Sequence, residues 1–164
     1  MSWRAAAALA ACLAAAGASA ETATFTVKTI TPEAAVKAAQ AALAKCRAEG
    51  FQVTVAVVDR SAITQALVRD RFASPQSIEI AQRKAQTAVN FKMDTAALDR
   101  ELQPGRAAAG LRAQPNVAAI AGGVPIESGG SLVGAIGVSG APGGMNDDLC
   151  AREGVKAIAE DLEF

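Results

Sequence analysis

The segment Arg69-Asp70-Arg71 places two guanidinium groups and a carboxylate at the end of a predicted strand. Arginine binds carboxylates through two parallel hydrogen bonds, so a charged rim here could receive a carboxylate group of a ligand. A solvated strand end is the plainer explanation of the same residues. We therefore take Arg69, Asp70 and Arg71 as candidate ligand-binding residues and keep the solvated strand end as the alternative.

Glycines are concentrated in residues 122–144, where exposed backbone could line a pocket. A loop that holds phosphate needs such backbone between a strand and the N-terminus of a helix. Residues 140–144 have this position, but they lack the Lys and Ser/Thr of a P-loop. Hairpin turns and a helix entry are the simpler explanation. The alternative is a pocket wall whose N–H groups face an anionic ligand, with Gly122 and Gly123 as candidate residues.

Acidic side chains and thioethers supply two further sets of candidate ligands. Asp147, Asp148 and Glu153 could bind a hard cation through their oxygens. Acids in the first turn of a helix also complement its dipole, and the sequence favours that role. Met93 and Met145 are suited to ordinary packing, and they become relevant only where a haem iron needs a soft ligand.

The chain contains cysteine but no histidine, which limits the catalytic classes available to it. Without imidazole, Ser-His-Asp and Cys-His catalysis are excluded, as is histidine ligation of zinc or haem iron. Cys46 and Cys150 lie on two different predicted helices, each on or near the apolar face. The sequence favours two buried free thiols there. A disulfide is the alternative, and it requires a Cα separation below about 7 Å.

Composition and charge indicate one folded domain of ordinary size. The chain has 164 residues, 51% of them hydrophobic, and 16 basic residues balance 16 acidic ones. So high an apolar fraction excludes an intrinsically disordered chain. The absence of a basic surplus argues against a nucleic-acid partner, and no segment after residue 20 is a candidate for spanning a membrane.

The first twenty residues have the features of a secretory signal peptide. Arg4 precedes a short run of Ala and Leu, and Ala18-Ser19-Ala20 presents small residues to a signal peptidase. We therefore expect cleavage before Glu21 and export to a periplasm or to the outside of the cell, where disulfides are permitted. A buried Ala-rich helix and a lipoprotein signal that ends at Cys12 are the alternatives.

The remaining sequence predicts an extension at residues 21–30 and a single domain at residues 31–164. Cap residues and helical spacing of apolar side chains predict helices that begin near Thr31, Ser74, Asp94 and Asn146. Short apolar runs predict five strands, at residues 51–58, 63–69, 117–121, 124–127 and 131–139. Because short links join antiparallel strands, we expect an α+β fold, an antiparallel sheet of about five strands with helices packed on it.

Two groups of short segments occur in a distinctive order along the domain. The earlier group comprises Val55-Ala-Val-Val-Asp59, the strand end at Arg69 and Asp70, Ser77, Ala81, Lys84-Ala85, Thr87-Ala88, Thr95 and Leu98. The later group comprises Gly122-Gly-Val-Pro-Ile126, Val133-Gly-Ala-Ile-Gly-Val-Ser-Gly140 and Asp148-Leu-Cys-Ala151. From about residue 31 onward, this arrangement resembles the GlcG/HbpS family, the haem-degrading domain family that includes a secreted haem-binding protein.

The resemblance implies a profilin-like α+β sandwich, assembly into homo-oligomers, and a small-molecule ligand, with haem as the cofactor of some members. This sequence departs from the family at Ser61-Ala62, where members usually have Gly, and in having no His. Haem could then bind through propionate contacts to Arg69 or Arg71, or through a different axial group such as Met93, Met145 or a Thr hydroxyl.

We accordingly expect an exported haem-binding-like accessory protein, and the absence of His keeps us from transferring the family's haem-degrading activity to it. Two alternatives stand beside this expectation. One is a binder of small organic acids of the glycolate type, and the other is a structural oligomer module that binds no ligand. The sequence assigns no catalytic residue under any of the three.

Overall fold

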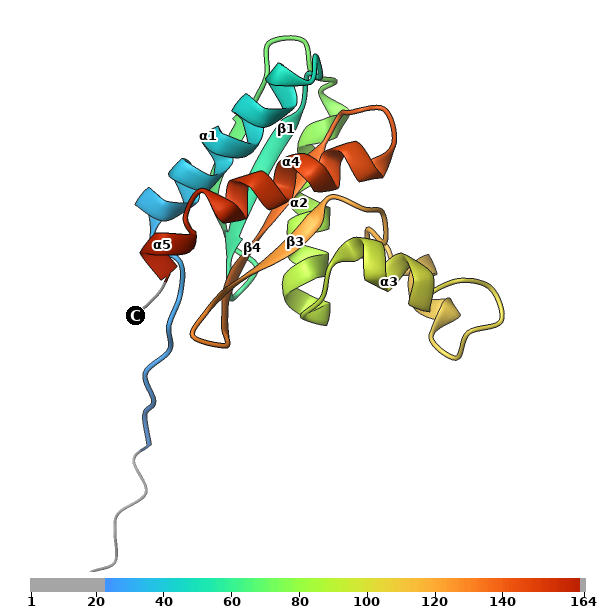
Figure 1. The fold of residues 1–164 in the computed structure, drawn as a ribbon. Helices are drawn as coiled ribbons and strands as arrows, with labels where there is room; N and C mark the ends of the chain where they lie inside the picture. Colours follow the sequence, from blue (N-terminus) through green and yellow to red (C-terminus); the bar gives the residue numbers. More distant parts are fainter. Residues whose placement is uncertain (1–22, 163–164) are drawn as a thin grey trace, which may run out of the picture.

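The structure is a computed structural model, which describes residues 23–162 (Figure 1). Five α-helices, one 3-10 helix and four strands are formed by these residues. In chain order they are α1 (Pro32–Ala48), β1 (Thr54–Asp59), β2 (Thr64–Arg69), α2 (Gln76–Phe91), α3 (Thr95–Glu101), η1 (Ala109–Ala113), β3 (Gly123–Ser128), β4 (Ser131–Ser139), α4 (Gly144–Lys156) and α5 (Ala159–Leu162). The signal peptide predicted at residues 1–20 lies outside the described residues.

The strands form one antiparallel sheet in the order β2-β1-β4-β3. The two central strands pair in register from Thr54 opposite Ser139 to Asp59 opposite Gly134. Arg69 ends β2 opposite Thr54, and Gly123 begins β3 opposite Gly137. Arg69 and Gly123 therefore lie at the same end of the sheet but on its two opposite edges.

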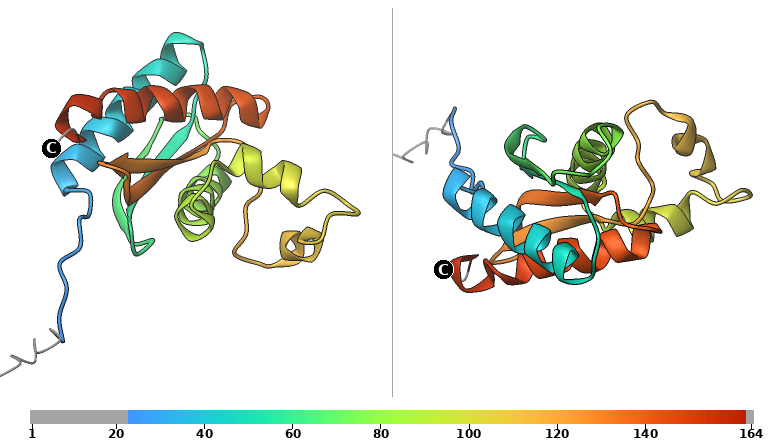
Figure 2. Two further views of the ribbon diagram at one scale, coloured as in Figure 1. Left: turned by 60° about the horizontal axis from the view of Figure 1, so that its bottom comes forward. Right: turned by 90° about the horizontal axis from the view of Figure 1, so that it is seen from above.

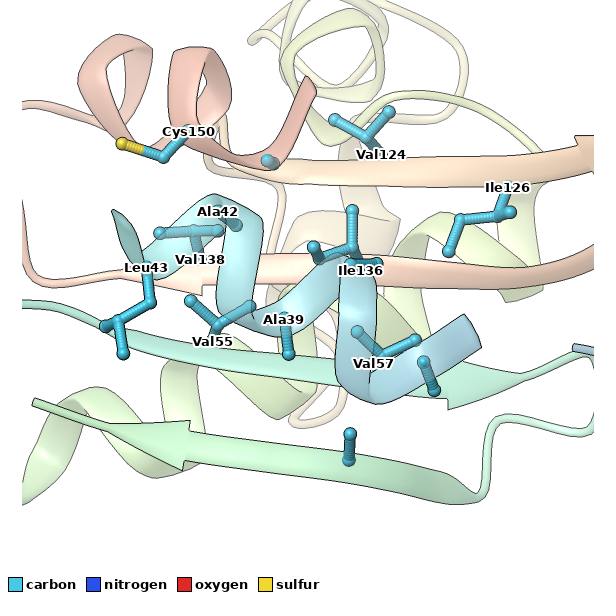
Figure 3. Packing of buried hydrophobic residues seen from close by; sticks show 14 of the residues in the cluster. Ala39, Ala42, Leu43, Val55, Val57, Val124, Ile126, Ile136, Val138 and Cys150 are labelled. Carbon is cyan, nitrogen blue, oxygen red and sulfur yellow. The ribbon is translucent and has the colours of Figure 1, made fainter. Parts of the chain in front are cut away.

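Helices cover both faces of the sheet, which makes the fold an α+β sandwich (Figure 2). Helices α1 and α4 lie together on one face, and α2 lies on the other. The larger core is formed between the sheet and the α1–α4 pair by Ala39, Ala42, Val55, Val57 and Ile136, among others (Figure 3). A smaller cluster around Val58, Ala85 and Ala135 fills the α2 face. Burial on both faces explains why the centre of β1, Val55-Ala56-Val57-Val58, is an unbroken apolar run.

Glycine lets α2 pack directly on the sheet. A Cβ atom added at Gly137 would lie 2.1 Å from the carbonyl oxygen of Ala81, which is far inside contact distance. Small residues on the facing side of α2, Ala81 and Ala85, are fully buried. Gly137 of β4 thus sets the distance between α2 and the sheet, as expected for tightly packed protein interiors.

The prediction of about five strands was wrong by one, because residues 117–121 do not form a strand. Their backbone finds partners in side chains of the α2 and α3 helices. Ala118 N–H donates to Thr87 Oγ1 at 2.9 Å, and the Ile120 carbonyl accepts from Thr95 Oγ1 at 2.7 Å. With these backbone groups satisfied, the segment has no need of a sheet neighbour.

The start of the last helix also differs from the sequence prediction. Helix α4 begins at Gly144 with Gly143 as its N-cap, rather than after a cap at Asn146 or Asp147. The two helix starts expected from a cap followed by proline are found close to their predicted places. Thr31 Oγ1 accepts from Ala34 N–H at 3.2 Å, and the side chain and carbonyl of Ser74 accept from the first N–H groups of α2.

Candidate functional site

A groove of about 580 Å³ lies where the chain enters the domain, and we call it the N-terminal groove. Its walls come from the extended residues 27–30, the first turns of α1, the ends of β3 and β4 that meet at their hairpin, and α5. Val27, Ile30, Ala34, Val133 and Leu162 provide its apolar surface. Its volume is within the range typical of pockets that hold small organic molecules.

Contacts between distant parts of the chain hold this groove together. Ile30 N–H donates to the Val133 carbonyl at 3.0 Å, which fixes the entering segment beside β4. Ser128 Oγ donates to the Leu162 carbonyl at 2.7 Å, which fixes α5 beside β3. The groove is therefore built from both ends of the domain.

Both signs of charge occur among the residues that line the groove. The cations are Lys28 and Lys37, and the carboxylates are Glu33 and Asp161. Lys37 Nζ lies 2.7 Å from Asp161 Oδ2, and about half of each side chain is exposed. Such an exposed pair contributes little stability and is easily exchanged for another partner. A ligand anion could therefore recruit Lys37.

The predicted rim at Arg69-Asp70-Arg71 exists, but Asp70 is an internal partner within it. The carboxylate of Asp70 is almost completely buried and accepts from Arg47 Nε at 2.7 Å and from Arg47 Nη2 at 3.0 Å. This bidentate hydrogen bonding from Arg47 holds the pKa of Asp70 below its usual value. Asp70 thus anchors Arg47 and is not available to a ligand.

The two predicted arginines remain at the surface beside this anchored pair. Arg69 Nη1 donates to the Ala73 carbonyl, and the backbone N–H of Arg71 donates to Asp70 Oδ1 at 2.8 Å. Together with Arg47 they form a cluster that we call the arginine corner, next to Phe72, whose side chain is 80% exposed. Three guanidinium groups and one buried carboxylate leave this corner positively charged.

Gly122 and Gly123, the predicted pocket wall, face protein atoms. A Cβ atom at Gly122 would lie 2.7 Å from Asp147 Cβ and 3.0 Å from Lys84 Nζ, and one at Gly123 would lie 2.6 Å from Thr95 Cγ2. These glycines therefore make room for neighbouring side chains. The Gly122–Gly123 start of β3 and the arginine corner lie on opposite edges of the sheet, so the structure does not bring the predicted residues together.

Lys84 and Asp147 form a buried ion pair that sequence analysis did not identify. Lys84 Nζ lies 2.7 Å from Asp147 Oδ2 and also donates to the Val138 carbonyl at 2.9 Å. Burial lowers the pKa of the Lys84 ammonium and raises the pKa of the Asp147 carboxyl. The attraction between the two charges opposes both shifts, because it favours the ionised form of each group. The signal available in the sequence was a lysine on the apolar face of α2.

The glycine-rich loop at residues 140–144 also serves Asp147. Ala141 N–H donates to Asp147 Oδ1 at 2.9 Å, and a backbone hydrogen bond from Gly140 further favours the carboxylate form. The anion that faces this loop is therefore a side chain of the protein itself.

The remaining acidic candidates and Met93 also have protein partners. Asp148 pairs with Arg152, which bridges to Asp94, at distances of 2.7 and 2.8 Å. Within residues 23–162, no group of three or more His, Cys, Asp or Glu side chains could hold a metal ion. Met93 is half-buried and packs against the small cluster of Leu98, Leu102 and Ala119.

Cys46 and Cys150 form a disulfide, so the interpretation as two free thiols was wrong. Their Cα atoms are 5.5 Å apart, and 104 positions of sequence separate them. Both residues are fully buried between α1 and α4. The sequence could not reveal that these two helices are neighbours, which is the condition for the bond.

Comparison with known proteins identifies relatives over most of the chain. A family model described as haem degrading protein HbpS-like matches residues 30–156. A double mutant of Streptomyces reticuli HbpS has a similar crystal structure, with a TM-score of 0.78 and 38% identity, over 94% of this chain and 99% of that one. The crystal structure of a PduOC–haem complex gives a TM-score of 0.75 and 30% identity, over 79% of this chain and 95% of that one.

A curated protein of Citrobacter freundii is similar in sequence. It is described as an uncharacterized 15.0 kDa protein in the dhaT-dhaS intergenic region, and it is 35% identical over 116 residues, which cover 70% of this chain and 82% of the relative. Among residues 23–162, the helices are all too short or too polar to cross a membrane.

Proposed function

We propose that this chain, which belongs to the HbpS-like family of haem degrading proteins, is an exported protein that binds haem in its N-terminal groove. The observation that carries the proposal is the groove itself, an apolar cavity of about 580 Å³ with cations at its border. The similarity to a haem complex at 30% identity supports the choice of ligand.

The residues of the groove fit a porphyrin and its propionates. Val27, Ala34 and Leu162 are at least partly exposed and offer apolar contacts to a flat macrocycle, and burial of such surface is the main source of affinity for an apolar ligand. Lys28 and Lys37 are placed to bind propionates, with Lys37 leaving its exposed partner Asp161. Haem, when bound, supplies an iron centre whose properties depend on the axial ligand.

The chain offers that iron no imidazole, because it contains no His. With Lys28 and Lys37 used for the propionates, the lining side chains left to face the iron include the hydroxyls of Thr29, Thr31 and Ser128, and neither Met93 nor Met145 lines the groove. We therefore propose that contacts with the macrocycle and the propionates hold the haem, and that axial ligation is weak. Added imidazole should then shift the Soret band of bound hemin to longer wavelength.

Hemin titration of the protein, followed by Soret absorbance, tests this proposal. The test variant is Val27→Asp, which puts a charge on the apolar wall. The control is Val36→Asp, because both valines are similarly exposed, at 46% and 42%, and Val36 does not line the groove. We expect at least tenfold weaker binding for Val27→Asp alone. Absence of a saturable Soret change, or equal binding by both variants, contradicts the proposal.

The arginine corner is a second candidate position for the same ligand. Its specific support is the surplus of guanidinium groups at Arg47, Arg69 and Arg71 beside the exposed ring of Phe72. Arg71→Ala should weaken hemin binding if propionates bind there, and Arg106→Ala on a distant exposed loop is the control. If Arg71→Ala weakens hemin binding and Val27→Asp does not, the haem site lies at the arginine corner.

Export is part of the proposal, and the disulfide supports it. Bonds between cysteines form and persist mainly in oxidising compartments, such as the periplasm or the cell exterior. Fractionation of cells that express the full chain, with mass determination of the N-terminus, tests export and cleavage before Glu21. A protein retained in the cytoplasm with intact residues 1–20 would contradict this part.

Assembly into a homo-oligomer is the last part of the proposal. Ile63 and Phe72 are 62% and 80% exposed, and we propose that contacts between subunits cover them. Light scattering after size-exclusion chromatography gives the mass in solution, and a monomer across the accessible concentration range contradicts assembly.

A further inference from the structure

A second cavity, of about 460 Å³, lies on the α2 side of the sheet, and we call it the hairpin cavity. It is bounded by the β1–β2 turn, the last turn of α2 and the hairpin that joins β3 to β4. Its floor includes Val89 and Leu132, which belong to the small hydrophobic cluster under α2. None of its lining residues lines the N-terminal groove. Arg60 does donate to the carbonyl of Lys28 in that groove, so Lys92 is the residue used below to test the two cavities separately.

The charged groups of the hairpin cavity have few partners of their own. Arg60 and Lys92 provide two cations, and Glu127 provides one carboxylate. None of the three forms an ion pair with any residue among 23–162, and the guanidinium of Arg60 reaches only the Lys28 carbonyl, at 3.4 Å. The cavity thus has one positive charge in excess and charged groups open to a ligand.

The backbone conformation of Lys92 is an independent indication that this lysine has a function. Lys92 ends α2 with a φ of +53°, in the left-handed region where glycine is strongly preferred. Among residues 23–162, the other non-glycine residue with positive φ is Ala62, in the β1–β2 turn that carries Arg60. Both unfavourable conformations therefore flank one cavity, and such backbone strain is concentrated at functional sites in proteins.

A lysine near a helix C-terminus also complements the helix dipole, which is a purely structural use. That use does not require position 92, because a lysine one turn earlier would serve it without the left-handed backbone. Position 92 is needed if the lysine side chain has to reach the hairpin cavity.

We infer that the hairpin cavity binds a small carboxylate that carries a hydroxyl or ammonium group next to its carboxyl group. Arg60 and Lys92 bind the carboxylate, since paired cations are the usual partners of this group. Glu127 and Ser131 accept hydrogen bonds from the neighbouring hydroxyl or ammonium, and Val89 and Leu132 contact a short apolar remainder.

Titration calorimetry of the full chain tests this assignment with four probes: L-lactate, L-alanine, acetate and inorganic phosphate. We expect binding of lactate or alanine at least tenfold tighter than that of acetate or phosphate. Preference for lactate identifies a hydroxy acid, and preference for alanine identifies an amino acid. No binding of either at millimolar concentration, or equal binding of all four probes, overturns the inference.

Substitutions then place the site. Lys92→Gly and Arg60→Gln should each weaken binding at least tenfold, whereas Lys156→Gln, which changes a 77% exposed lysine on α4, should not. Lys92→Gly should at the same time raise the urea midpoint, because glycine adopts the left-handed conformation freely. If Lys92 has only a structural role, Lys92→Gly should raise the urea midpoint and leave the binding of lactate and alanine unchanged.

Hemin titration of Lys92→Gly separates this inference from the proposed haem function. We expect unchanged hemin binding, since Lys92 does not line the N-terminal groove. Unchanged binding of lactate and alanine by Lys92→Gly and Arg60→Gln overturns the assignment of the cavity, whatever the result with hemin.

Discussion

Removal of the disulfide between Cys46 and Cys150 should cost a large part of the stability of the domain. The bond closes a loop over a sequence separation of 104, for which loss of chain entropy in the unfolded state predicts about 4.7 kcal/mol. Measured losses for native disulfides are usually about 2–5 kcal/mol. A domain of this size has a total stability of roughly 5–15 kcal/mol, so the reduced form should be only marginally folded.

Urea denaturation followed by circular dichroism measures this effect, with the oxidised protein and a Cys46→Ala/Cys150→Ala variant compared. The expected result is a midpoint that falls sharply in the variant and a denaturant slope that rises, because the uncrosslinked chain exposes more surface on unfolding. Reductant should not change the variant further, which is the control. A loss below about 1 kcal/mol would falsify the chain-entropy argument.

The rate of reduction provides a second test of the same bond. Both cysteines are fully buried, so a reductant in native buffer can reach the sulfurs only after the domain opens. Reduction should therefore be slow without denaturant and fast in urea. Rapid reduction of the native protein would show that the α1–α4 contact opens more easily than its packing indicates.

Four further substitutions, one of them only in a double variant, test other parts of the structure. Ala62→Gly should raise the free energy of unfolding by roughly 1 kcal/mol, because φ at this position is +65°, and urea denaturation measures the gain. Lys84→Met should lower it by roughly 3–5 kcal/mol, because Asp147 then loses its partner while buried. In the same assay, Lys84→Met/Asp147→Leu should recover much of that loss, and no recovery would show that the pair is not the cause. Asp70→Asn should lower stability at neutral pH, since Arg47 stabilises the carboxylate of Asp70 and lowers its pKa. That contribution is complete above the ordinary pKa of about 3.9 and is lost as pH falls through the lower folded pKa, so the two proteins should converge in acid.

Most elements of the fold could be predicted from local sequence, because cap residues and turns act over a few positions. The helix starts at Thr31 and Ser74 and the hairpin strands are examples. Residues 117–121 could not be assigned correctly, since their partners are Thr87 and Thr95, which lie more than twenty positions earlier. An apolar run alone does not tell whether its backbone will pair with a strand or with side chains.

The candidate sites depended even more on distant contacts. Arg69 and Arg71 were found because they are close in sequence, but their buried neighbour Asp70 is paired with Arg47, 23 positions away. The N-terminal groove joins Ile30 to Val133, and no local pattern indicates that contact. Gly122 and Gly123 were misinterpreted for a related reason. Glycine is required both where a neighbouring side chain packs closely against the backbone and where the backbone lines an open pocket.

The loop at residues 140–144 also bears on how glycine-rich motifs are interpreted in general. Its strand-to-helix position suits a bound anion, yet Asp147, three residues after Gly144, occupies that role as an intramolecular ligand. An acidic residue one turn into the following helix can therefore mimic a phosphate and satisfy such a loop from within. In a motif search, an acidic residue at this position can be used as a signal against nucleotide binding. Loops of this kind would then be excluded from their sequence alone.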